Sequence, residues 1–162
     1  MSNNQRKDRF LQSIPQASID NDPGFAQRAK FNFSFFCAGE DAGENFQDWE
    51  HSKLCGLLHK LKDYGRESLQ HWQRETAGKS GTVLAIYGGF PLRSEFKHPK
   101  HVPHQARWGR FRIDQATRLV GFILPPEYEG KRDPLSGAMF DCNTFYVVFL
   151  DQEHRFYKTE PR

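Results

Sequence analysis

The sequence predicts an α+β fold in which a helical hairpin packs on one face of a mainly antiparallel, twisted sheet. Three observations favour this class: an aromatic strand pattern early in the chain, two helical patterns in its middle, and a group of strand patterns near its end. The 162 residues amount to about one ordinary domain, which is long enough to bury a single core.

The first part of the chain is predicted to be a flexible or loosely attached arm over residues 1–28, followed by one domain over residues 29–162. The arm mixes polar residues with isolated apolar ones, and Asp22-Pro23-Gly24 is a turn signal. Residues 31–36 then alternate aromatic and polar side chains with a period of two. This alternation predicts a strand with one buried face.

Two helices are predicted in the middle of the chain. From Phe46 to Leu61, apolar residues recur at helical spacing, which predicts an amphipathic helix of about five turns. Asn45 is placed to cap its beginning. A second, shorter helix is predicted to begin near Ser68 and to stop at Gly78. Together they form the helical hairpin.

Four later segments predict strands because they are rich in β-branched and apolar residues. They are residues 82–87, 106–114, 117–124 and 144–151. The two-residue link Gln115-Ala116 favours a hairpin, although it lacks the Gly or Asn usual there. Prolines in 93–105 and the Pro, Gly and Asp content of 125–143 predict loops. Asp151-Gln152-Glu153 predicts a turn, after which residues 154–157 could continue as a short strand.

Composition places the chain among soluble globular proteins. Its hydrophobic content of 37% and aromatic content of 14% are too high for a chain that is disordered throughout. The beginning of the sequence lacks a signal-peptide pattern, and no run of about 18 apolar residues predicts a membrane span. The three cysteines form no CxxC pair, so a reducing cytoplasm is the expected location.

Positive charge is concentrated between Arg93 and Arg118, where seven Lys or Arg residues meet only two acids. A period of two places Arg110 and Arg112 on one face of their strand and Phe111 on the other. Arginine offers paired donors to phosphate oxygens, so this face is a candidate phosphate surface. The alternative is an ordinary solvated face of an antiparallel sheet.

Three histidines in the same basic loop, His98, His101 and His104, stand three residues apart. The intervening prolines exclude the helix that would align them, and Lys100 would repel a cation, so neither a metal site nor a cofactor is predicted. The loop is better suited to contact a phosphate backbone or to supply a general acid or base.

The ordered set Trp108 to Arg112, Thr117 to Val120, and an apolar strand ending in His154 to Tyr157 resembles the RelE/ParE superfamily of bacterial toxins. The resemblance covers residues 30–158 in topology. It implies a RelE-like fold and a metal-independent endoribonuclease that cleaves messenger RNA, often on the ribosome, by attack of a 2′-hydroxyl on the adjacent phosphorus. It also implies an antitoxin protein as a partner, and no membrane.

The resemblance implies three catalytic residues. Arg112 would stabilise the phosphate, His154 would be the general acid or base, and Tyr157 would orient or stack. The expected phosphate and RNA contacts, including a base stacked on Trp108, come from a further set: Lys97, Lys100, His101, Trp108, Arg110 and Arg118.

Two other functions remain open at this point. The basic surface could dock a nucleic acid or an acidic partner protein without breaking any bond, which predicts association that weakens with salt. A structural or phage-related protein, whose charges serve only solvation, is the third possibility.

Overall fold

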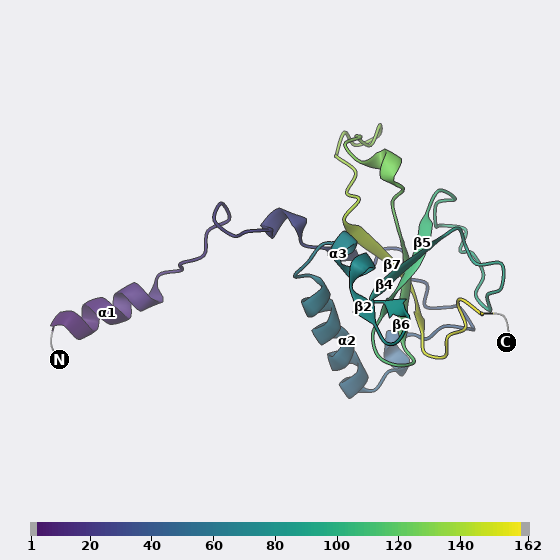
Figure 1. The fold of residues 1–162 in the computed structure, drawn as a ribbon, viewed down its shortest axis with the longest axis horizontal. Helices are drawn as coiled ribbons and strands as arrows, with labels where there is room; N and C mark the ends of the chain where they lie inside the picture. Colours follow the sequence, from purple (N-terminus) through teal and green to yellow (C-terminus); the bar gives the residue numbers. More distant parts are fainter. Residues whose placement is uncertain (1–2, 160–162) are drawn as a thin grey trace.

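A five-stranded sheet forms the centre of the computed structural model, which describes residues 3–159 (Figure 1). The strand order is β1-β7-β6-β5-β4, with β1 parallel to β7 and every other pair antiparallel. The strands are β1 (Lys30–Asn32), β4 (Leu84–Gly88), β5 (Arg107–Arg112), β6 (Arg118–Ile123) and β7 (Thr144–Asp151). Outside this sheet, β2 (Thr76–Ala77) and β3 (Gly81–Thr82) form a small hairpin.

Two helices, α2 (His51–Tyr64) and α3 (Leu69–Arg74), pack on one face of the sheet. The Tyr64 ring stacks on Phe111 of β5, with ring centroids 4.8 Å apart. Leu57 and Leu69 complete the same buried cluster. The predicted α+β class, with helices on one face of a mostly antiparallel sheet, is therefore confirmed.

Irregular segments, not helices, cover much of the other face. Phe96 and Val102 from the loop before β5, and Phe156 from the segment after β7, pack against Trp108 and Phe149. Because both faces are covered, all six residues of β6 are buried. The second cluster covers only part of this face, and the candidate site lies beside it.

The N-terminal arm contains a third helix, α1 (Asn3–Ser13), which extends away from the α+β body (Figure 1). The sequence did not predict this helix, because its apolar side chains are few and are confined to its second half. The chain joins the body at Gln27, whose carbonyl accepts from Nδ2 of Asn143 at 2.7 Å, and at Ala29, whose N–H donates to the Glu67 carbonyl at 2.8 Å. None of the helices in the described part of the chain is long and apolar enough to span a membrane.

Several predicted elements are shorter in the structure. The second helix, predicted to stop at Gly78, ends at Arg74, because residues 76–77 pair with β3 as a strand. The strand predicted over 31–36 ends at Asn32, because the Asn32 side chain accepts hydrogen bonds from the N–H and the hydroxyl of Ser34 and starts a turn. The helix predicted from Phe46 begins at His51; residues 46–48 instead form a short 3₁₀ turn, which Asn45 caps. The long loop after β6 is confirmed.

The close approach of β6 and β7 depends on Gly121. A Cβ atom at this position would lie 2.0 Å from the Tyr146 carbonyl oxygen, within a buried strand pair whose register shifts between Val120 and Gly121. Backbone on both sides is fixed by the sheet, so nothing can move to make room.

We expect Gly121→Ala to destabilise the protein by about 3 kcal/mol or more, because the added methyl group forces the central strands apart. Urea denaturation measures this change. Gly56→Ala is the matched control: Gly56 lies within α2 with no heavy atom within 4 Å of an added Cβ. That substitution should stabilise the protein by up to about 1 kcal/mol, since alanine favours helix. Equal effects at the two positions would contradict the close-packing explanation.

Candidate functional site

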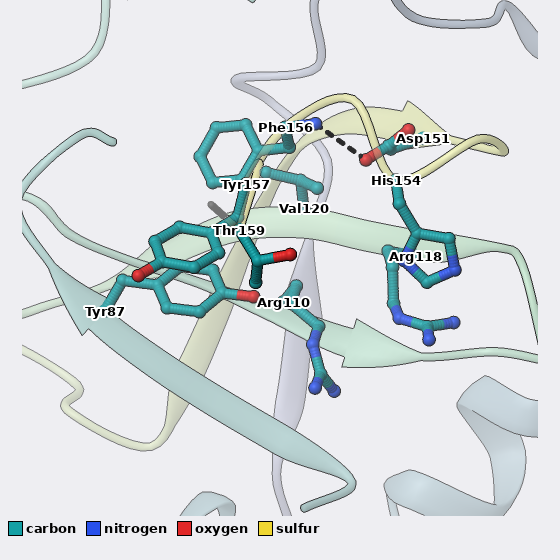
Figure 2. Close-up of a pocket in the computed structure, with 9 residues that line it drawn as sticks. All are labelled: Tyr87, Arg110, Arg118, Val120, Asp151, His154, Phe156, Tyr157 and Thr159. Carbon is teal, nitrogen blue, oxygen red and sulfur yellow. Dashed lines mark hydrogen bonds between the residues drawn. The ribbon is translucent and has the colours of Figure 1, made fainter. Parts of the chain in front are cut away.

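A cavity of about 290 Å³ opens on the face of the sheet that carries no helix among the described residues. Its lining comes from β4, β5, β6, the end of β7 and the segment that follows (Figure 2). The nine lining residues are Tyr87, Arg110, Arg118, Val120, Asp151, His154, Phe156, Tyr157 and Thr159. The cavity therefore gathers residues from four separate parts of the sequence.

The polar and aromatic side chains occupy different sides of the cavity. Figure 2 shows the rings of Tyr87 and Tyr157 lying parallel on one side, with centroids 4.4 Å apart and an interplanar angle of 9°. Arg118 and His154, which both contact the Gln115 carbonyl oxygen, lie on the other, and Arg110 lies between the two groups. A bound group would thus meet cations on one flank and an aromatic pair on the other.

Strand register explains why the arginines share a face. Arg112 of β5 is opposite Arg118 of β6, and Arg110 is opposite Val120. Alternation puts Phe111 on the opposite face, where it is fully buried in the core beneath the helices. The prediction that Arg110 and Arg112 share one face, with Phe111 on the other, is confirmed.

Arg110 and Arg112 are held by the β2–β3 hairpin. Nη1 of Arg110 donates to the Thr82 carbonyl at 2.9 Å. The Arg112 guanidinium lies over Gly78, close enough that a Cβ built there would be 2.7 Å from Nη1. Arg112, expected to be the phosphate-stabilising arginine, is thereby directed to the hairpin and does not line the cavity.

Arg118 is only 9% exposed and is held by backbone oxygens. Its guanidinium donates to the carbonyls of Asp114, Gln115 and Thr117 at 2.8, 3.2 and 2.9 Å. Burial lowers the pKa of Arg118, and the charges of Arg110 and Arg112 lower it further. An arginine nevertheless stays charged at neutral pH.

The three arginines lack ion-pair partners: within residues 3–159, no carboxylate forms an ion pair with Arg110, Arg112 or Arg118. Positive charges that repel one another and are held by neutral carbonyls are stabilised by an added anion. The arrangement therefore suits a phosphate group or a carboxylate.

The β5–β6 turn positions both Arg118 and His154. Oδ1 of Asp114 accepts the N–H groups of Ala116 and Thr117 at 2.9 and 2.7 Å, which closes the turn without Gly or Asn. The Gln115 carbonyl is thereby exposed to two donors, Nη2 of Arg118 and Nε2 of His154, each at 3.2 Å. The connection is five residues long, not the two predicted.

Asp151, at the end of β7, organises the segment that carries His154 and Tyr157. Its carboxylate is 2% exposed and accepts the backbone N–H groups of Glu153, Arg155 and Phe156 at 3.2, 3.0 and 2.9 Å. Figure 2 shows the bond to Phe156. The prediction that residues 154–157 continue as a short strand is therefore wrong. The backbone N–H groups of this segment bind the Asp151 side chain and not a neighbouring strand.

The backbone of His154 has φ = 55°, the left-handed conformation, which is uncommon for residues other than glycine. This conformation turns its ring over the Gln115 carbonyl. Because a carbonyl only accepts, Nε2 is the protonated nitrogen in neutral His154, and Nδ1 keeps a free lone pair. His154 can therefore take a proton through Nδ1.

Four of the residues predicted from the sequence meet in the cavity: Arg110, Arg118, His154 and Tyr157. Lys97, Lys100 and His101 do not line it. His101 instead stacks on Phe35 and contacts its carbonyl oxygen at 3.0 Å through Nε2.

The prediction that Trp108 reaches the surface and stacks on a base is wrong. Trp108 is 1% exposed and packs among phenylalanines that include Phe149 and Phe156. Its alternation with Arg110 and Arg112 gave no sign that loop residues would cover this end of the face. A base cannot stack on its buried ring.

Sequence reasoning missed five lining residues: Tyr87, Val120, Asp151, Phe156 and Thr159. Asp151 alone carried a signal, an acid at the end of an apolar strand before a polar turn. Tyr87 ends β4, and only tertiary structure stacks it on Tyr157.

The described residues offer no metal site, and Cys142 is not an activated thiol. Within residues 3–159, no group of three or more His, Cys, Asp or Glu side chains is placed to hold a metal ion. Burial is the main cause, and a hydrogen bond to Glu129 the second, that raise the pKa of Cys142 to about 11. The Cys142 thiol therefore stays protonated at neutral pH and is a poor nucleophile.

Comparison of the chain with protein-family models, with curated proteins and with solved structures found no match. Function is therefore argued from the geometry of the cavity.

We expect Asp114→Ala to destabilise the protein by about 1 kcal/mol, because two backbone N–H groups of the turn lose their acceptor. Burial alone would raise the pKa of Asp114, but the N–H groups of Thr117 and Ala116 help to leave it below the ordinary value. The stabilisation is thus complete above about pH 4 and is lost as the pH falls through the folded pKa.

Asp114→Asn is the control, since its amide oxygen can still accept both bonds. Urea denaturation at pH 7 should rank the proteins wild type, Asn variant, Ala variant. The difference between wild type and the Asn variant should shrink as the pH is lowered below 4. An Asn variant no more stable than the Ala variant would contradict the role given to Asp114.

Proposed function

We propose that the protein is a metal-independent endoribonuclease of RelE-like toxin type, which cleaves messenger RNA in the cytoplasm and is controlled by an antitoxin partner. The observation that carries the proposal is the meeting of Arg110, Arg118, His154 and Tyr157 in one cavity. Cations that pair with no carboxylate among residues 3–159, a histidine and an aromatic ring are groups suited to RNA cleavage without metal.

The reaction begins with a phosphodiester bound between Arg110 and Arg118. The 2′-hydroxyl of the preceding ribose attacks phosphorus and loses its proton to Nδ1 of His154, while the bond to the 5′-oxygen breaks. The products are a 2′,3′-cyclic phosphate and a 5′-hydroxyl, so atoms and charge balance once water or a protonated group supplies the proton to the leaving oxygen.

The arginines stabilise the additional negative charge that develops on the phosphoryl oxygens in the transition state. Arg118 is well placed for this role, because its three carbonyl contacts fix its guanidinium before the substrate arrives. Phosphate stabilisation is thus assigned to Arg110 and Arg118, and Arg112 contributes through its charge from outside the cavity.

We expect His154→Ala to lower the rate of RNA cleavage by about 10²- to 10⁴-fold, because proton transfer is lost. RNA binding at low salt should change little. Labelled RNA, incubated with and without a chelator, gives the rate, and relief of growth arrest on expression gives a second readout.

His154→Asn is the decisive control, since asparagine tolerates positive φ and can donate to the Gln115 carbonyl but transfers no proton. It should be as inactive as the Ala variant, whereas His104→Ala, outside the cavity, should retain activity. Cleavage by the Asn variant at the wild-type rate would contradict the role of His154 as the general base.

A second candidate function is RNA or acidic-partner binding without catalysis. The bond from His154 to the Gln115 carbonyl favours it, because a ring held by the backbone can be purely structural. In this case labelled RNA associates with the protein in a salt-dependent manner and remains intact.

Salt dependence tests the phosphate contact that both functions share. Arg110→Gln should weaken binding of single-stranded RNA and reduce the slope of log affinity against log salt by about 0.7, the value of one phosphate contact. Arg74→Gln, at an exposed position of α3, should leave the slope unchanged. Equal slopes for Arg110→Gln and wild type would place the phosphate elsewhere.

A further inference from the structure

A second cavity, of about 560 Å³, adjoins the cationic one. It is lined by Tyr87, Gly89, Phe90, Pro91, Leu92, Arg93, Tyr157, Lys158 and Thr159. Tyr87, Tyr157 and Thr159 line both cavities, so the stacked tyrosine pair is a common wall. A molecule that extends past this wall would occupy both.

The two cavities differ in charge. The cationic cavity contains two arginines that form no ion pair within residues 3–159. The second cavity also contains two cations, but Lys158 pairs with Glu95 and Arg93 is likewise not without a partner. Aromatic and aliphatic groups supply much of the remaining lining. The second cavity therefore suits a flat, uncharged group better than a second phosphate.

Apolar surface remains uncovered at the second cavity. Leu92 is fully exposed, and Tyr157 is 46% exposed although its ring stacks on Tyr87. Two such side chains beside a cavity offer a contact surface for a partner ring.

The second cavity is held in shape by backbone contacts. Gly88 ends β4 with φ = 90° and turns the chain toward the C-terminal segment. Glu95 N–H then donates to the Arg155 carbonyl at 3.0 Å, and Lys158 N–H donates to the Arg93 carbonyl at 3.1 Å. The loop and the C-terminal segment are thus joined in the unbound protein, so little ordering is needed when a ligand binds.

We propose that this second cavity is a nucleobase subsite, which binds the base of a nucleotide next to the phosphate held by Arg110 and Arg118. The proposal rests on the proposed function for the identity of that phosphate. Continuity of the two cavities across the tyrosine wall, and their contrast in charge, match the alternation of phosphate and base along a strand. The base must leave its own stack to enter, so the substrate is single-stranded RNA.

The test compares two uncleavable probes on the full chain at low salt: a 2′-O-methyl RNA trinucleotide, and the same backbone with each position made abasic in turn. We expect one of the abasic probes to bind about 5- to 150-fold more weakly than the complete probe, which is the contribution of a stacked base. Equal affinity for the complete and every abasic probe would overturn the subsite.

Variants show which residues cause the preference for the complete probe over the abasic one. Leu92→Ala should reduce the preference for the complete probe several-fold without changing affinity for the abasic one. Tyr157→Leu should reduce it further, and Tyr157→Phe should preserve it because the ring is kept. Leu135→Ala is the matched control, since Leu135 is equally exposed in a different loop. A loss of equal size with Leu135→Ala would also overturn the assignment.

The outcome separates this inference from the proposed function. Base-dependent binding with intact natural RNA supports the subsite and contradicts cleavage. Cleavage of natural RNA, together with equal binding of complete and abasic probes, supports the proposed function and contradicts the subsite. Failure of every probe to bind contradicts both.

Discussion

The buried carboxylate of Asp151 is the interaction on which the site depends. By accepting three backbone N–H groups, it bends the chain directly after β7 and returns it across the sheet. The bend inserts Phe156 into the core, and His154 and Tyr157 from the same segment line the cavity. One desolvated acid thus links the stability of the second core cluster to the geometry of the candidate catalytic groups.

The same carboxylate forms no ion pair with the neighbouring arginines, although Asp151 is opposite Arg118 in the strand register and lines the same cavity. Its oxygens are occupied by backbone donors, and Arg118 is held by carbonyl oxygens in return. The cavity consequently retains positive charge that burial makes less favourable. A bound anion would offset this cost, because no carboxylate among residues 3–159 pairs with these arginines. This positive charge is the physical argument for an anionic ligand.

The aromatic residues near the cavity have two different roles, which depend on how deeply each is buried. Trp108 and Phe156 serve the core, whereas Tyr87 and Tyr157 stack at its margin and keep an exposed edge. The margin is therefore apolar beside a cationic cavity, a combination that suits nucleotides better than inorganic anions. Gly121 allows the close approach of β6 and β7, the strand that ends at Asp151.

Sequence alone determined the α+β class, the order of the main elements and the shared face of Arg110 and Arg112, because these follow from local periodicity and the two-residue repeat of a strand. The sequence also identified His154 and Tyr157 as candidate site residues, because they occur together with the basic loop and the arginine-bearing strand. Only tertiary structure decided which cations line the cavity. Arg112 lies over Gly78, and His101 lies against Phe35, through contacts between residues far apart in the chain. Burial of Trp108 and the pairing of Tyr87 with Tyr157 depend likewise on how loops fold back, which no local pattern encodes.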